Sequence, residues 1–176
     1  TSTFMQIMKA YTAFNNEGYM STPKIVSHLY HDGNKYKPYN NKPEKVISKQ
    51  TAAKMKKLLV QTVDEGTGKA AKMYGLEIGG KTGTAQIARK GKYLKKYISS
   101  FFGFVNDGEN SYTIGVTVMN PISTGKYWYY HYASWSAVPV FKEITENLIK
   151  LNYLTPKNDI IFSIIYKSKK RYNFGK

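Results

Sequence analysis

The chain has 176 residues, 41% of them hydrophobic and 15% aromatic, so it is long enough for one folded domain and too apolar to stay disordered. It contains no cysteine, which excludes disulfides, metal-thiolate sites and a cysteine nucleophile. The net charge of +16 indicates a lysine-rich surface with a general attraction to anions. Because the positive residues are spread along the chain without an arginine-rich helix, we do not expect nucleic acid as a partner.

The first predicted element is a helix that begins at a cap formed by Ser2 or Thr3. Apolar residues follow the cap at helical spacing as far as Phe14, and Asn and Gly residues end the pattern. Residues 19–47 are rich in Pro, Asn, Gly and Tyr. They predict a loop with one short ribbon near residues 24–30.

A second helix is predicted to begin after Ser48, which serves as its cap, and to end at residues 64–68. Apolar residues recur within it at the spacing of one helical face. The residues expected on its buried side are Ala52, Met55, Leu58, Leu59 and Val63.

Three strands and a closing helix are predicted in the second half of the chain. The strands cover residues 76–87, 97–105 and 112–119, and Asp107 with the glycine after it indicates a hairpin between the last two. The helix covers residues 137–151. Together the elements predict an α+β fold with an antiparallel sheet flanked by helices, and so thin a domain is expected to be part of something larger.

The segment 79–85, Gly-Gly-Lys-Thr-Gly-Thr-Ala, is the one most suggestive of chemistry. Glycines cost stability in a strand, and one reason to keep them is the close approach of another backbone, such as a peptide substrate pairing along the strand. Lys81 would then supply positive charge for a substrate carboxylate and for proton movement. The hydroxyls of Thr82 and Thr84 could hold that carboxylate, and a backbone N–H near Thr84 could stabilise an oxyanion.

A phosphate-binding loop is the competing interpretation, because residues 75–82 match the pattern G-x-x-x-x-G-K-[ST]. Such a loop needs an apolar strand before it and a helix that begins at its Lys-Thr pair. Residues 69–74 are a poor buried strand, and residues 83–87 are a poor helix start. The context therefore disfavours this alternative.

The pattern Lys-Thr-Gly-Thr-Ala at residues 81–85 resembles the lysine-threonine-glycine strand of penicillin-binding proteins and serine β-lactamases. Further segments resemble the class B, FtsI-like peptidoglycan D,D-transpeptidases in order and spacing. They are residues 2–18, 66–71, 92–104 and 136–141. The resemblance implies that residues 1–155 are the C-terminal half of a transpeptidase domain, with residues 156–176 as a basic C-terminal tail.

The resemblance also implies roles for individual residues of this strand and the next. Lys81 would be the catalytic lysine near the nucleophilic serine. Thr82 and Thr84 would contact the carboxylate of a substrate or β-lactam, with Gly83 between them in the substrate-binding strand. The Thr84 N–H would form half of an oxyanion hole, and Tyr97 would lie beside a bound inhibitor.

The sequence departs from the family in two places. Tyr127 and Trp128 stand where relatives place an aromatic wall, but residues 129–132 replace the glycine pair expected after it. The S-x-x-K motif of the serine nucleophile and the S-x-N motif are also not where the family has them. Literal S-x-x-K matches begin at Ser21 and Ser123, but neither starts an apolar helix, so the nucleophile is expected outside this chain.

The activity that the resemblance implies is the cross-linking of peptidoglycan stem peptides in septal cell-wall synthesis, through a serine acyl-enzyme that β-lactams also form. The expected partners are stem peptides, β-lactam antibiotics, an N-terminal segment that carries the serine, and divisome proteins. The expected location is the periplasmic face of the bacterial inner membrane, with an anchor outside this chain because no apolar run or signal peptide is present. No cofactor and no metal are expected, since the three histidines have no acid partner at a ligand spacing. A β-lactamase-type hydrolase, a non-catalytic envelope binding module and a phosphate-loop protein are the alternatives.

Overall fold

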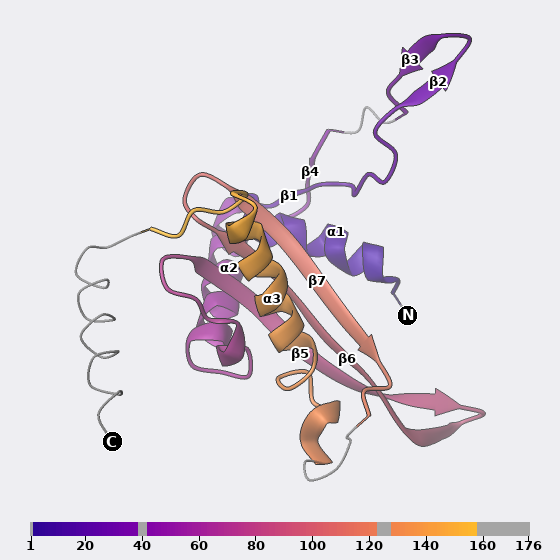
Figure 1. The fold of residues 1–176 in the computed structure, drawn as a ribbon, viewed down its shortest axis with the longest axis vertical. Helices are drawn as coiled ribbons and strands as arrows, with labels where there is room; N and C mark the ends of the chain where they lie inside the picture. Colours follow the sequence, from indigo (N-terminus) through magenta and orange to yellow (C-terminus); the bar gives the residue numbers. More distant parts are fainter. Residues whose placement is uncertain (1, 39–41, 123–127, 158–176) are drawn as a thin grey trace.

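A three-stranded antiparallel sheet forms the centre of the fold (Figure 1). The computed structural model describes residues 2–38, 42–122 and 128–157. The strands follow one another in space in the order β5-β6-β7. They are β5 (Glu77–Arg89), β6 (Lys92–Asn106) and β7 (Ser111–Met119).

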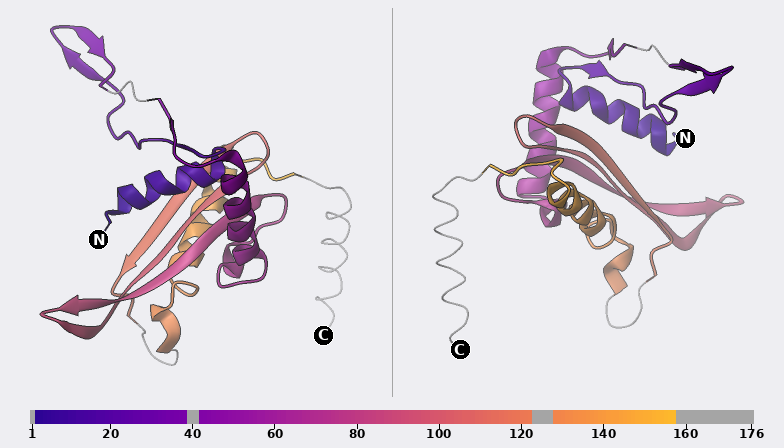
Figure 2. Two further views of the ribbon diagram at one scale, coloured as in Figure 1. Left: turned by 180° about the vertical axis from the view of Figure 1, so that it is seen from behind. Right: turned by 45° about the horizontal axis from the view of Figure 1, so that its top comes forward.

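Helices cover both faces of this sheet (Figure 2). Helix α3 lies on one face, where the ring of Phe141 meets that of Phe101 on β6 at 4.9 Å. Helix α1 lies on the other face, where Phe4 meets Phe102 at 5.2 Å, and α2 stands beside β5. The helices are α1 (Phe4–Asn15), α2 (Lys49–Asp64) and α3 (Ala137–Lys150), with short 3-10 helices η1 (Lys69–Ala71) and η2 (Trp128–His131). This arrangement confirms the predicted α+β class.

The helix starts lie where their caps predicted them. Thr3 accepts a hydrogen bond from the backbone N–H of Gln6, whose side chain in turn accepts from the Thr3 N–H, so that a complete capping box starts α1. Ser48 accepts from the backbone N–H of Thr51 at the start of α2. These caps satisfy N–H groups that have no partner within the helix.

The segment between α1 and α2 contains two small antiparallel pairs (Figure 1). Strand β1 (Tyr19–Met20) pairs with β4 (Glu44–Lys45), and β2 (Leu29–His31) pairs with β3 (Asn34–Tyr36). The prediction of a ribbon near residues 24–30 was wrong in position. Asp32 and Gly33 both have positive φ and form the turn, so the hairpin begins later in the chain.

Two further predictions need correction. Strand β6 begins at Lys92, not residue 97, because β5 turns back through Lys90 and Gly91, both with positive φ. Met55 and Leu58 were expected on the buried side of α2, but their side chains are 37% and 58% exposed. Helix α2 buries only a narrow stripe of Ala52, Leu59 and Val63.

The Asp107 carboxylate ties the β6–β7 hairpin to the chain that follows α3. It accepts hydrogen bonds from the backbone N–H groups of Glu109, Asn110 and Thr155, and from the Asn110 side chain. The bonds from Asn110 and Thr155 hold the pKa of Asp107 well below its usual range.

None of the helices in the described residues has the length and hydrophobicity that a membrane span requires.

Candidate active-site strand

Strand β5 is an edge of the sheet and carries the candidate residues. The sheet of the described residues ends at β5, so the far side of this strand has no strand partner there. Residues 75–82 run into this strand rather than into a helix, and this rules out the phosphate-binding loop. Helix α2 and the loop after it flank the first part of β5. Where an edge strand is not covered, it offers backbone N–H and C=O groups to an extended peptide.

Lys81 projects from the face of the sheet that α1 covers. It pairs directly with Phe102, and opposed residues of an antiparallel pair lie on the same face. The Phe102 ring contacts Phe4 and Tyr11 of α1, which identifies that face. The Lys81 side chain is exposed, and its ammonium group donates to the carbonyl oxygen of Thr82 at 3.1 Å.

Thr82 and Thr84 project from the opposite face of the same strand. They pair with Phe101 and Ser99 on β6, whose side chains lie on the α3 face. The Thr82 hydroxyl is 2.7 Å from the Thr67 hydroxyl. The Thr84 hydroxyl accepts a hydrogen bond of 3.1 Å from a backbone N–H of the segment after η2. The two hydroxyls are therefore held by groups distant in the sequence.

Tyr97 lies on the same face as the two threonines. It pairs with Gln86 of β5, whose side-chain amide donates to the Tyr97 hydroxyl at 3.5 Å. The Tyr97 ring stacks on the imidazole of His131 at 4.4 Å between centroids. The Ser99 hydroxyl donates to the backbone carbonyl of His131 and so fixes η2 over β6. The structure brings Thr82, Thr84 and Tyr97 to one face and Lys81 to the other.

The glycines of β5 serve two different purposes. A Cβ atom at Gly79 would stand 2.3 Å from the Phe104 ring, and one at Gly80 would stand 2.4 Å from the Phe101 ring. These two glycines therefore make room for rings of β6, and not for another backbone as the sequence suggested. Gly83 differs, because it is exposed and an added Cβ would meet nothing within 4 Å. The open space beside Gly83 is available to a ligand.

The remaining candidates from the sequence do not add to this strand. Ser21 lies in a segment without helical structure, where its backbone N–H donates to Thr12, so it does not begin the helix that an S-x-x-K motif requires. Ser123 and Tyr127 lie outside the described residues, as do the Trp128 side chain and residues 158–176 of the tail.

Sequence analysis missed the partners of the threonines. The partner of Thr82 is Thr67, which lies in a Gly-Thr-Gly loop that the sequence marked only by its resemblance to the family. The partner of Thr84 is the backbone N–H of Ala133, 49 residues away. Neither residue type nor local spacing indicates these contacts. Within the part of the chain that the structure describes, no group of three or more His, Asp or Glu side chains is placed to hold a metal ion.

Comparison with known proteins assigns the family. Residues 1–146 match the penicillin-binding protein transpeptidase domain. The chain belongs to this family. It is 36% identical to stage V sporulation protein D of Bacillus subtilis over 124 residues. This match covers 68% of the chain and 19% of that protein. It is 30% identical to the peptidoglycan D,D-transpeptidase FtsI of Buchnera aphidicola over 156 residues. This match covers 79% of the chain and 26% of that protein.

Solved structures have the same fold. Penicillin-binding protein 3 of Mycobacterium tuberculosis, determined in complex with ampicillin, superposes with a TM-score of 0.72 at 27% identity, over 90% of this chain and 37% of that one. The transpeptidase domain of penicillin-binding protein 3 from Burkholderia pseudomallei gives a TM-score of 0.65 at 27% identity, over 87% and 43% of the two chains. The fold is that of the penicillin-binding protein transpeptidases. The chain spans less than half the length of each of these relatives.

Proposed function

We propose that this chain is the C-terminal half of the transpeptidase domain of a peptidoglycan D,D-transpeptidase. The observation that carries the proposal is the position of β5 at the edge of the sheet, which presents Lys81, Thr82 and Thr84 in a chain that belongs to the transpeptidase family. Residues 1–155 form this half, and residues 156–176 form a basic tail. The nucleophilic serine and the S-x-N motif belong to an N-terminal segment.

In the proposed reaction, a stem peptide pairs along the edge of β5. The serine oxygen attacks the penultimate D-alanine carbonyl and forms the ester bond of an acyl-enzyme. The amide bond to the terminal D-alanine breaks, and the serine proton reaches the leaving amine through a base of the completed site. A neighbouring peptide's amine then attacks the ester carbonyl. A new amide bond replaces the ester bond, and a proton from the amine returns to the serine oxygen through the same base. A β-lactam stops this sequence at the acyl-enzyme.

The residues of this chain bind and orient the substrate. Thr82, Gly83 and Thr84 hold the substrate strand, and the two threonine hydroxyls contact its terminal carboxylate. The Thr84 N–H forms half of the oxyanion hole, which stabilises the charge on the tetrahedral oxygen. Lys81 adds positive charge next to the serine. No Asp or Glu occurs between residues 78 and 106, so the strand attracts a carboxylate.

A partly apolar surface on the α1 face suits the segment that carries the serine. Ile98 of β6 pairs with Met119 of β7, and Met119 is 72% exposed. Phe4 and Met5 at the start of α1 are 41% and 43% exposed. Lys81 lies on the same face, so a segment packed there would bring its serine to the lysine.

The cellular setting is part of the same proposal. The enzyme acts on the periplasmic face of the inner membrane, in septal synthesis, together with divisome proteins. The support is the likeness to FtsI of Buchnera aphidicola and to stage V sporulation protein D. The stem peptide and β-lactams are the proposed ligands, and nucleic acid is not.

Penicillin labelling tests the proposal. The intact protein that contains this chain is incubated with a fluorescent penicillin, digested and analysed by mass spectrometry. A single stable adduct on a serine outside residues 1–176 is the expected result. An adduct on Ser21 or Ser123 would overturn the assignment of the nucleophile. Rapid turnover of the penicillin would indicate a hydrolase, and no adduct would indicate a binding module.

A further inference from the structure

The hairpin formed by β5 and β6 continues beyond the rest of the sheet as a basic ribbon. The pairing of β7 with β6 ends at Ile98, whereas β5 and β6 stay paired as far as Arg89 and Lys92 (Figure 1). Five of the eight residues from 89 to 96 are Lys or Arg. Arg89 and Lys92 are directly opposed, and such like-charge pairs destabilise a sheet. The ribbon therefore concentrates positive charge, whose mutual repulsion an anionic ligand would relieve.

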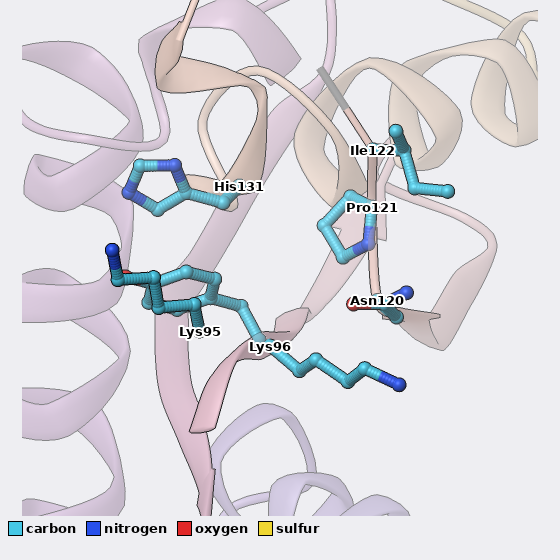
Figure 3. Close-up of a pocket in the computed structure, with 7 residues that line it drawn as sticks. Lys95, Lys96, Asn120, Pro121, Ile122 and His131 are labelled. Atoms are coloured by element: carbon cyan, nitrogen blue, oxygen red, sulfur yellow. The ribbon is translucent and has the colours of Figure 1, made fainter. Parts of the chain in front are cut away.

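A cavity of about 340 Å³ lies at the base of this ribbon. Its walls are residues 95–97 of β6, residues 120–122 after β7, and His131 of η2. Figure 3 shows Lys95 and His131 on one side of the cavity and Pro121 and Ile122 on the other. None of the lining residues is acidic. The cavity combines two lysines with an apolar wall, which suits an aliphatic side chain that ends in an anion.

The walls of the cavity are held in place by contacts of their own. The ring of Tyr97 stacks on that of His131 at 4.4 Å, and the Ser99 hydroxyl donates to the His131 carbonyl. The backbone N–H of Asn120 donates to the Tyr97 carbonyl at 2.7 Å. A site whose walls are already ordered loses less conformational entropy when a ligand binds.

The cavity is also connected to the candidate active-site strand. Two residues after His131, the Ala133 N–H donates to the Thr84 hydroxyl at 3.1 Å. Tyr97 lies opposite Gln86 of β5 in the sheet. Adjacent strands are about 5 Å apart, so a peptide on the outer edge of β5 lies about two strand spacings, roughly 10 Å, from the β6 residues that line the cavity.

We propose that this cavity is a second subsite of the enzyme and binds a carboxylate on a side chain of the peptidoglycan peptide. The inference rests on the proposed function, because it assumes that the peptide lies along β5. Lys95 and Lys96 supply the positive charge, and Pro121 and Ile122 contact the aliphatic part of the side chain. The subsite selects among peptides with the same D-alanine terminus.

The test uses the intact protein that contains this chain and two N-acetylated peptides ending in D-alanyl-D-alanine. The peptides are identical except that one carries a side-chain carboxylate ahead of this terminus and the other carries its amide. Dissociation constants are measured for the wild type and for the double variant Lys95→Gln/Lys96→Gln. The matched control is Lys54→Gln/Lys57→Gln, which removes the same charge from exposed lysines of α2.

The wild type and the control are expected to bind the carboxylate peptide about tenfold more tightly than the amide peptide. The Lys95/Lys96 variant is expected to lose this preference and keep its affinity for the amide peptide. If the preference survives in that variant, or the control also loses it, the subsite is wrong and general surface charge explains the binding. If both peptides bind the wild type equally, the subsite alone is wrong. If neither peptide binds, the proposed function fails together with the subsite.

Discussion

Replacement of Gly80 by alanine tests the packing of the active-site strand. The new Cβ would stand 2.4 Å from the Phe101 ring and 2.9 Å from the carbonyl oxygen of Phe102. Phe101 is fully buried against Phe141, so its ring has no free space to enter. Overpacking of this kind costs about 1–3 kcal/mol. We expect the free energy of unfolding to fall by that amount in urea denaturation followed by circular dichroism.

Gly83 provides the matched control in the same strand. Its φ lies outside the left-handed region and an added Cβ meets no atom within 4 Å, so the replacement of Gly83 by alanine is expected to gain about 0.5–1 kcal/mol. The same methyl group would occupy space that the proposed substrate uses, so β-lactam acylation of the intact protein should become slower. The reasoning is refuted if the alanine variant at Gly80 is as stable as the wild type, or if both variants lose equal stability.

Two further substitutions test hydrogen bonds that join distant segments. Because bonds from Asn110 and Thr155 lower the pKa of Asp107, its carboxylate contributes stability above its ordinary pKa of 3.8, and this contribution is lost as the pH falls toward the lower folded-state pKa. The variant Asp107→Asn is therefore expected to have a lower Tm at pH 7 and a weaker decline of Tm between pH 5 and pH 2; an unchanged decline would contradict the assignment. The variant Thr84→Val leaves the Ala133 N–H without its acceptor and is expected to lose about 1 kcal/mol in urea denaturation, with Thr84→Ser restoring it. Equal stability of the valine and serine variants would speak against this bond.

Local features of the fold could be predicted from the sequence because local chemistry determines them. Thr3 and Ser48 cap their helices through bonds to residues three positions later, which a sequence pattern can represent. The burial of individual side chains on α2 could not be predicted from the sequence in the same way. Met55 and Leu58 have the spacing of a buried face, but the described part of the chain covers only a narrow stripe of α2. Helical spacing predicts a face and not how much of it is covered.

The start of β6 was missed for a related reason. Between the pairs Gln86–Tyr97 and Ala88–Tyr93, β5 has one residue and β6 has three, so alternation breaks inside the hairpin. The broken alternation and the lysines of residues 92–96 are typical of a loop, so the sequence indicated a strand only from residue 97. The pairing with β5 that makes residues 92–96 part of a strand is not visible in their own sequence.

The candidate residues of β5 were predicted from one motif, but the sequence did not show how the sheet arranges them. Lys81 lies on one face of β5 and Thr82 and Thr84 on the other, because side chains alternate along a strand. A ligand bound to one face would contact the lysine alone, and a ligand bound to the other face would contact the two threonines alone. A ligand paired along the open edge lies between the two faces and can meet both, with Gly83 leaving space on the side of the lysine. The alternation of the motif and the position of β5 at the edge therefore favour a peptide that binds as an added strand.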